Sequence, residues 1–159
     1  MSMIDWHARA AALTIDGRAL IGGQRVDAAD GGLFECLSPV DGRKLADVAR
    51  CRQADIDRAV AAAREAFEAR RWAGMSPGER KRAMIRFADL VMANREELAL
   101  LETLDMGKPI SASMNTDVPA TANTLRWFGE AIDKVYDEIA PTADHTLALI
   151  TREPIGVVA

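Results

Sequence analysis

The residue types that most often carry catalysis are few in this chain. It has two histidines, His7 and His145, and two cysteines, Cys36 and Cys51. No histidine and cysteine lie at the spacing of metal ligands, and neither cysteine has a histidine close to it in sequence. Both cysteines lie in strand-like surroundings, so we interpret them as small, partly buried apolar side chains. These residues predict no metal site and no catalytic nucleophile.

Charge and glycine patterns argue against several classes of partner. No glycine-rich phosphate loop follows a predicted strand. The basic residues at 80–82 and Arg86 point in several directions on a helix, which favours a solvated face over an anion site. The net charge of −4 gives no electrostatic footprint for nucleic acid or for an anionic membrane. The longest apolar runs are shorter than the roughly 20 residues that span a bilayer. We expect neither a nucleic-acid nor a membrane partner.

Composition places the chain among globular proteins. It has 159 residues, of which 49% are hydrophobic and 28% charged. Residues 1–12 lack a basic start followed by an apolar core, so no secretory signal is visible. Two cysteines are too few for a disulfide framework. A reduced, cytoplasmic setting is the expectation.

The first part of the chain has the pattern of short strands. A helix is expected at residues 4–13, followed by a hairpin of residues 19–21 and 24–26 around Gly22 and Gly23. Strands at residues 33–37 and 44–49 complete what we predict to be one small antiparallel sheet.

The apolar period then changes from two residues to about 3.6, which predicts helices. The first covers residues 53–71. The second begins with a capping box of Ser76 and Glu79, with Pro77 at its first position. Asn94 is expected to end the second helix and to cap a third, which Gly107 ends. Leu98, Leu101 and Leu104 are expected to face the core from the third helix. A fourth helix is predicted over residues 113–139, with Pro119 at its start or at a kink, and with Leu125, Phe128, Ile132 and Val135 on its apolar face.

The end of the chain reads as two strands. Residues 146–152 alternate in the manner of a half-buried strand, and residues 155–159 form an apolar run typical of a buried parallel strand. A parallel strand needs a following helix and neighbouring strands. We therefore expect the chain to be the front of a larger protein, cut in mid-strand; the alternative is an ordinary C-terminal edge strand.

Three stretches together resemble the aldehyde dehydrogenase family. Residues 101–109 (LETLDMGKP) are similar to that family's Glu-Thr-Leu-Asp-x-Gly-Lys-Pro stretch. Residues 152–159 (REPIGVVA) are similar to the segment that leads into its cofactor domain, and residues 21–23 with 38–42 are similar to its N-terminal strands. The resemblance covers residues 20–159. Residues 126–136 further resemble the branch acting on gamma-glutamyl-gamma-aminobutyraldehyde and related aminoaldehydes.

The resemblance implies an α/β fold made of the N-terminal helices and small antiparallel strands of an aldehyde dehydrogenase, cut at the first Rossmann strand. Residues 1–52 would form the N-terminal strands and short helix, and residues 53–140 the helical part of the cofactor-domain region. Residues 141–154 would belong to an oligomerisation arm and residues 155–159 to the first Rossmann strand. A homo-oligomer is the implied assembly.

The resemblance also implies a chemistry, namely oxidation of an aldehyde to the carboxylic acid with NAD or NADP. The family's cysteine nucleophile, glutamate base and oxyanion-holding asparagine all match positions beyond Ala159, and neither Cys36 nor Cys51 matches the nucleophile. The chain is therefore expected to hold no catalytic residue, to bind no cofactor and to be inactive by itself.

The family's long helix lines the substrate entrance, and Thr116, Asp117 and Ala120 match its tunnel-lining positions. Asp117 would attract a cationic amino group on the substrate. Its alternative role is that of an acid in the first turn of a helix, where the helix dipole favours it. An alternative for the whole chain is a non-enzymatic interaction module that self-associates through the strands of residues 146–159.

Overall fold

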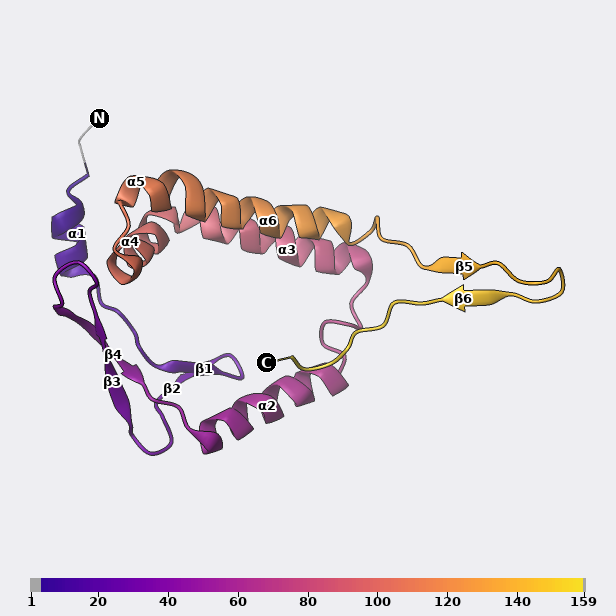
Figure 1. Ribbon diagram of the computed structural model, residues 1–159, viewed down its shortest axis with the longest axis horizontal. Helices are drawn as coiled ribbons and strands as arrows, with labels where there is room; N and C mark the ends of the chain where they lie inside the picture. Colours follow the sequence, from indigo (N-terminus) through magenta and orange to yellow (C-terminus); the bar gives the residue numbers. More distant parts are fainter. Residues whose placement is uncertain (1–3, 159) are drawn as a thin grey trace.

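The structure is a computed structural model that describes residues 4–158. Its helices are α1 (Trp6–Ala12), α2 (Gln53–Glu68), α3 (Pro77–Ala93), α4 (Arg95–Met106), α5 (Ile110–Ala112), the π-helical turn η1 (Ser113–Asp117) and α6 (Val118–Ala131). Its strands are β1 (Ala19–Ile21), β2 (Gln24–Val26), β3 (Leu33–Leu37), β4 (Lys44–Ala49), β5 (Glu138–Ala140) and β6 (Ala148–Ile150). In Figure 1, α3 and α6 run side by side, and β5 and β6 extend away from them as an arm.

The predicted strands at the front of the chain are confirmed, but their assembly differs. Strands β1 and β2 pair around Gly22 and Gly23, whose φ angles of 58° and 79° match the left-handed turn that joins such hairpins. Strands β3 and β4 pair separately. The expected single sheet is therefore two hairpins. Alternation shows which side chains share a face of a strand, and a short turn shows which neighbour the strand pairs with, but neither shows whether two hairpins pair with each other.

Helix α2 is shorter than predicted and is fixed at its start by a buried acid. It ends at Glu68, because Arg70 has a φ of 53°, which a right-handed helix cannot contain. Asp55 is only 2% exposed. Its carboxylate accepts from the N–H groups of Arg52 at 3.1 Å and of Ala29 at 2.9 Å. It thus joins the helix to the loop after β2.

The junctions of α3 and α4 confirm two predictions and correct one. The Ser76 hydroxyl accepts from the Glu79 N–H at 3.3 Å, and the Glu79 carboxylate accepts from the Ser76 N–H at 2.8 Å. Gly107 ends α4 with a φ of 74°. Asn94 does not cap α4, since its amide donates to the Leu90 carbonyl of α3 at 2.8 Å. Its φ and ψ of −103° and 20° are far from the extended conformation of an N-cap.

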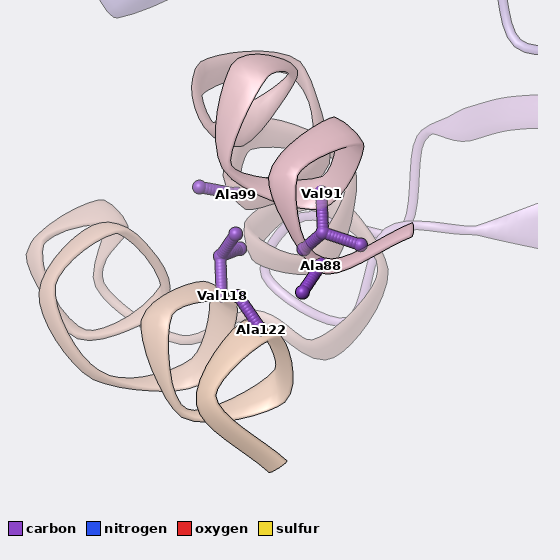
Figure 2. Close-up of a cluster of buried hydrophobic side chains, with 5 residues drawn as sticks. All are labelled: Ala88, Val91, Ala99, Val118 and Ala122. Carbon is purple, nitrogen blue, oxygen red and sulfur yellow. The ribbon is translucent and has the colours of Figure 1, made fainter. Parts of the chain in front are cut away.

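The core lies where α3, α4 and α6 meet, and it is built from small side chains. Figure 2 shows Ala88 and Val91 of α3 facing Val118 and Ala122 of α6, with Ala99 of α4 beside them. On α4, Ala99 and Leu100 are buried, whereas Leu98 is 37% exposed, so Leu98 was wrongly expected in the core. Leu101 and Leu104 are half-buried.

The fourth predicted helix is displaced toward the start of the chain. The helical run covers residues 110–131, as α5, η1 and α6 in succession, and Pro119 lies in the first turn of α6. Residues 138–140 instead form β5, which pairs with β6. Phe128 and Val135 of the predicted apolar face are 57% and 61% exposed. Gly129 is buried instead, because α6 approaches α3 too closely for a large side chain at this position.

The end of the chain confirms one strand and corrects another. Strand β6 lies inside the predicted range 146–152. Residues 155–158 form no strand, and Ile155 is 91% exposed. Within residues 4–158 nothing pairs with this segment, and a strand forms only when a neighbour takes up its backbone hydrogen bonds. Ala159 lies outside the described residues.

No helix within residues 4–158 is both long enough and apolar enough to cross a membrane.

Replacing Ser76 with alanine should destabilise the chain. The variant loses the N-cap of α3, which should lower the free energy of unfolding by about 1 kcal/mol in a denaturant titration. Hydrogen bonds from Ser76 lower the pKa of Glu79. Glu79 therefore stabilises the folded chain fully above the pKa that its carboxyl has in the unfolded chain. This stabilisation is lost as the pH falls through the lower pKa of the folded chain. Ser111→Ala, at an exposed serine, should change stability by less than about 0.5 kcal/mol. Equal losses in the two variants would contradict the capping role.

Two glycine substitutions should have opposite effects. A Cβ at residue 129 would lie 2.9 Å from the Met84 Cβ, so Gly129→Ala should force α6 from α3 and cost about 1–2 kcal/mol net of the better helix propensity. At residue 78 the nearest atom is the Arg82 Nη1 at 3.6 Å, so Gly78→Ala should be neutral or stabilising. Thermal unfolding of both variants provides the measurement. A Gly129→Ala variant more stable than the unchanged chain would refute the close approach of α6 to α3.

Candidate functional site

The predicted site residues lie at the π-helical turn η1. The Val118 N–H donates to the Ser113 carbonyl, which is the bond of a π turn rather than an α turn. Thr116 and Ala120 are exposed, and Asp117 is half-buried. Single π turns inside α-helices are frequent at functional sites.

Asp117 lines a cleft between α3, α4 and α6, with a volume of about 580 Å³. Apolar side chains form most of the wall, and three carboxylates of Glu97, Glu102 and Asp117 lie along it. The remaining lining residues are Phe87, Leu90, Val91, Asn94, Leu98, Val118 and Thr121. Thr116 and Ala120 are not among them, so the structure does not bring the three predicted residues into one cavity. An apolar wall with a few carboxylates suits a ligand that has an apolar body and a positive end.

Lys108 joins two of these carboxylates. Its ammonium lies 2.7 Å from the Glu102 carboxylate and 2.8 Å from that of Asp117. The hydrogen bonds that the ammonium donates, to Asp117 first and then to Glu102, raise the pKa of Lys108. One positive charge faces two negative ones, so the bridge keeps a net negative charge, to which Glu97 adds. The cleft is therefore negative at neutral pH.

The bridge gives Asp117 a structural contact that neither of its two predicted roles included. The helical run begins at Ile110, so Asp117 lies inside it and not at a free N-terminus. The helix dipole is strongest within the first turn, and the contact with Lys108 is what holds Asp117. Asp117 is therefore held by an ion pair as well as by its position next to α6.

Sequence reasoning missed Lys108 and Glu102, although both lie in the quoted stretch of residues 101–109. Lys108 and Asp117 are separated by 9 positions. That spacing does not bring side chains together on one regular helix. The turn at Gly107 and the break at Pro109 place Lys108 against η1, and no local pattern indicates this approach.

The histidines and cysteines form no site in the described part of the chain. His7 and His145 are exposed, and both cysteines are half-buried free thiols. The Cys36 Sγ lies 3.4 Å from the Asp105 carboxylate, and burial and this carboxylate raise the pKa of the thiol. A raised pKa lowers the thiolate fraction and so the reactivity. Within residues 4–158, no three histidine, cysteine or acidic side chains are placed to hold a metal.

The arm of β5 and β6 is a second notable surface. Ile139, Leu147, Leu149 and Ile150 are all more than half exposed on it. Soluble chains rarely leave an apolar group of this kind uncovered, so such a surface is typical of an interaction site.

Sequence comparison identifies the family. The profile of the aldehyde dehydrogenase family matches residues 26–159, most of the chain. This chain belongs to the aldehyde dehydrogenase family. The resemblance of residues 101–109 and 152–159 to this family is thereby confirmed.

Individual members of the family are similar over nearly the whole chain. The NADP/NAD-dependent aldehyde dehydrogenase PuuC of Escherichia coli is 49% identical over 97% of this chain and 31% of its own length. The crystal structure of gamma-glutamyl-gamma-aminobutyraldehyde dehydrogenase from Burkholderia cenocepacia is 53% identical, with a TM-score of 0.93, and covers 96% of this chain and 31% of that one. Indole-3-acetaldehyde dehydrogenase of P. syringae, solved with NAD+ and IAA, is 57% identical, with a TM-score of 0.92 and the same two coverages.

These likenesses confirm the predicted fold class, that of the helices and small antiparallel strands at the front of an aldehyde dehydrogenase. They extend to the predicted branch, since a gamma-glutamyl-gamma-aminobutyraldehyde dehydrogenase is among them. The chain spans about a third of the length of the relatives that it matches.

Removing the ammonium of Lys108 should leave the Glu102 and Asp117 carboxylates without their cationic partner. Lys108→Met should lower the free energy of unfolding most below about pH 9, where the lysine is charged, and less as the pH rises further. The raised pKa of Lys108 means that its contribution to stability is complete below the unfolded pKa and is lost as the pH rises through the folded value.

Denaturant titrations across this pH range provide the measurement. Lys134→Met is the control, because Lys134 is 61% exposed and bonds mainly within its own turn of chain. A loss for Lys108→Met that does not change with pH would show that the bridge acts through packing and not through charge.

Proposed function

We propose that this chain forms the N-terminal part of an NAD(P)-dependent aldehyde dehydrogenase that oxidises an amine-bearing aldehyde to the carboxylic acid. The observation that carries the substrate class is the negatively charged cleft at η1, where Asp117 and Glu97 line an apolar wall. Family membership supports the reaction class. The nucleophile and the base belong to residues outside this chain, so the chain alone is inactive.

The reaction is an oxidation by hydride transfer to a nicotinamide cofactor, through a covalent thioester that water then hydrolyses. Either NAD or NADP would serve, as the description of the Escherichia coli relative suggests. Neither dinucleotide is proposed to bind these 159 residues alone. The role of this chain is to form one wall of the path by which the aldehyde enters. In this proposal Thr116 and Ala120 face the substrate from the exposed side of η1 and α6, and Asp117 acts from the cleft.

The relatives point to two kinds of aldehyde. One is named for gamma-glutamyl-gamma-aminobutyraldehyde, whose glutamyl end carries an ammonium beside a carboxylate, and another for indole-3-acetaldehyde, which is neutral. The carboxylates of the cleft favour an aldehyde whose far end is an ammonium without a carboxylate beside it. A partly desolvated pairing of a carboxylate with an ammonium contributes about 1–3 kcal/mol, the range for hydrogen bonds to charged groups. That free energy corresponds to roughly a 5- to 150-fold preference.

The apolar arm supports a homo-oligomer. Strands β5 and β6 expose Ile139 and Leu149 together with unpaired edges, and a second copy could cover both. The same surface would serve the alternative, a non-enzymatic module that self-associates. Membership of an enzyme family favours the dehydrogenase. Both cysteines are free thiols, which supports a reducing, cytoplasmic setting.

Asp117→Asn tests the proposal in the full-length enzyme. The change keeps the size of the side chain and removes its charge. It should raise KM for 3-aminopropanal about 5-fold or more, with kcat nearly unchanged, because the contact is remote from the reacting carbon and equal in ground and transition states. KM for butanal, which carries a methyl group in place of the ammonium, should not change.

The control is Asp144→Asn, at an exposed carboxylate in the turn between β5 and β6. It should leave both aldehydes unaffected. Equal losses of Asp117→Asn toward charged and neutral aldehydes would show that Asp117 only supports the helix, and the substrate class would then have to be abandoned.

A further inference from the structure

The π-helical turn and the proline that follows it leave the Met114 carbonyl without a backbone donor. In η1 the Val118 N–H donates to the Ser113 carbonyl. In the same register, the next N–H along the chain would donate to the Met114 carbonyl. That next residue is Pro119, which has no N–H. A half-buried carbonyl without a partner is costly, so the Met114 carbonyl requires a donor from elsewhere.

Arg95 supplies this donor from α4. Its Nε donates to the Met114 carbonyl at 2.7 Å, and its Nη2 donates to the side-chain oxygen of Asn115 at 2.9 Å. The first bond is short, as expected for a charged donor. The planar guanidinium reaches both acceptors at once, which a lysine ammonium on its flexible stem cannot do in the same geometry. Arg95 therefore takes the position of the N–H that Pro119 lacks.

Two registers of this helix compete, and they differ in the use of the Met114 carbonyl. In a regular α-helix the Val118 N–H would donate to Met114. The ring of Pro119 would then press against the Asn115 carbonyl, and the wider π turn relieves this contact. In the regular register the Met114 carbonyl already has a backbone donor, so the bond from Arg95 stabilises the π register more than the regular one.

The register decides where Asp117 points. Removing the extra residue of a π turn rotates the preceding helix by about 100° relative to the following one. Lys108 meets Asp117 across this turn at 2.8 Å, so that rotation would separate them. At the first residue of η1, the Thr103 hydroxyl lies 3.1 Å from the hydroxyl of the fully buried Ser113. Helix α4 thus contacts the first part of the turn through both Thr103 and Arg95.

We propose that Arg95 is a positioning residue, whose guanidinium replaces the missing N–H of Pro119, holds η1 in its π register and so keeps Asp117 aimed into the cleft. Its effect on substrate choice rests on the proposed function. Its effect on the register and on stability does not.

A double-mutant cycle on the chain tests the register directly. Arg95→Met should raise the unfolding equilibrium constant about 10- to 100-fold, the loss expected when a buried carbonyl is left unpaired. Pro119→Ala restores an N–H at residue 119, and the Met114 carbonyl can then find a backbone donor in either register. In the Pro119→Ala background, Arg95→Met should therefore cost less than about 3-fold.

The control is Arg86→Met, at an exposed arginine for which residues 4–158 show no hydrogen bond or ion pair; it should be neutral in both backgrounds. Arg95→Lys should lose an intermediate amount. If Arg95→Met fails to fold and the double variant folds, the rescue supports the proposal. Equal cost in the two backgrounds, or failure of both variants to fold, overturns it.

The catalytic consequence is read in the full-length enzyme. Arg95→Met should raise KM for 3-aminopropanal and leave kcat and the KM for butanal nearly unchanged, and it should add nothing in an Asp117→Asn background. If Asp117→Asn does not change the KM for 3-aminopropanal, the proposed substrate class is refuted. The double-mutant cycle on stability still tests the role of Arg95 in that case. An additive loss from Arg95→Met and Asp117→Asn would show that Arg95 does not act through Asp117.

Discussion

The close approach of α3 to α6 is the constraint on which the rest of this structure depends. The two helices meet through Ala88, Ala122 and Gly129, and a single added carbon at residue 129 would already crowd Met84. Side chains this small bring two helices together but fill little volume. The larger apolar residues are consequently turned outward, among them Phe87 and Phe128, each more than half exposed. Phe87 lines the cleft, whereas Phe128 belongs to the exposed apolar surface outside it.

The charged side chains at this site lie on the apolar helices, and one lysine contacts two carboxylates. The α4 helix carries Glu97 and Glu102 along the cleft, and the turn at Gly107 returns Lys108 against Asp117. One ammonium between two carboxylates fixes the geometry and still leaves a negative surface. A neutralised pair would hold the helices equally well but would offer nothing to a positively charged substrate. This excess of negative charge is what connects the packing of the helices to the proposed choice of aldehyde.

Features that depend on a few adjacent residues could be predicted from the sequence. The capping box of Ser76, the glycine hairpin of β1 and β2 and the end of α4 at Gly107 are each fixed by local backbone chemistry. Burial was predicted less well, because apolar spacing shows a face but not how closely the partner helix approaches. Leu98 was therefore expected to face the core and is 37% exposed. The bridge from Lys108 to Asp117 and the bond from Arg95 to Met114 join separate elements, and no pattern along the chain shows them. The strand predicted at the end of the chain was wrong for a related reason, because a strand forms only when a neighbouring strand pairs with it.

The central claim is that the cleft at η1 selects aldehydes by charge. The most direct test is the kcat/KM of the unmodified full-length enzyme for 3-aminopropanal and for butanal, measured over a range of salt concentrations. The account predicts a clear advantage for the amine-bearing aldehyde at low salt, and this advantage should fall as salt screens the carboxylates of the cleft. Butanal oxidised as efficiently as 3-aminopropanal at every salt concentration would contradict it.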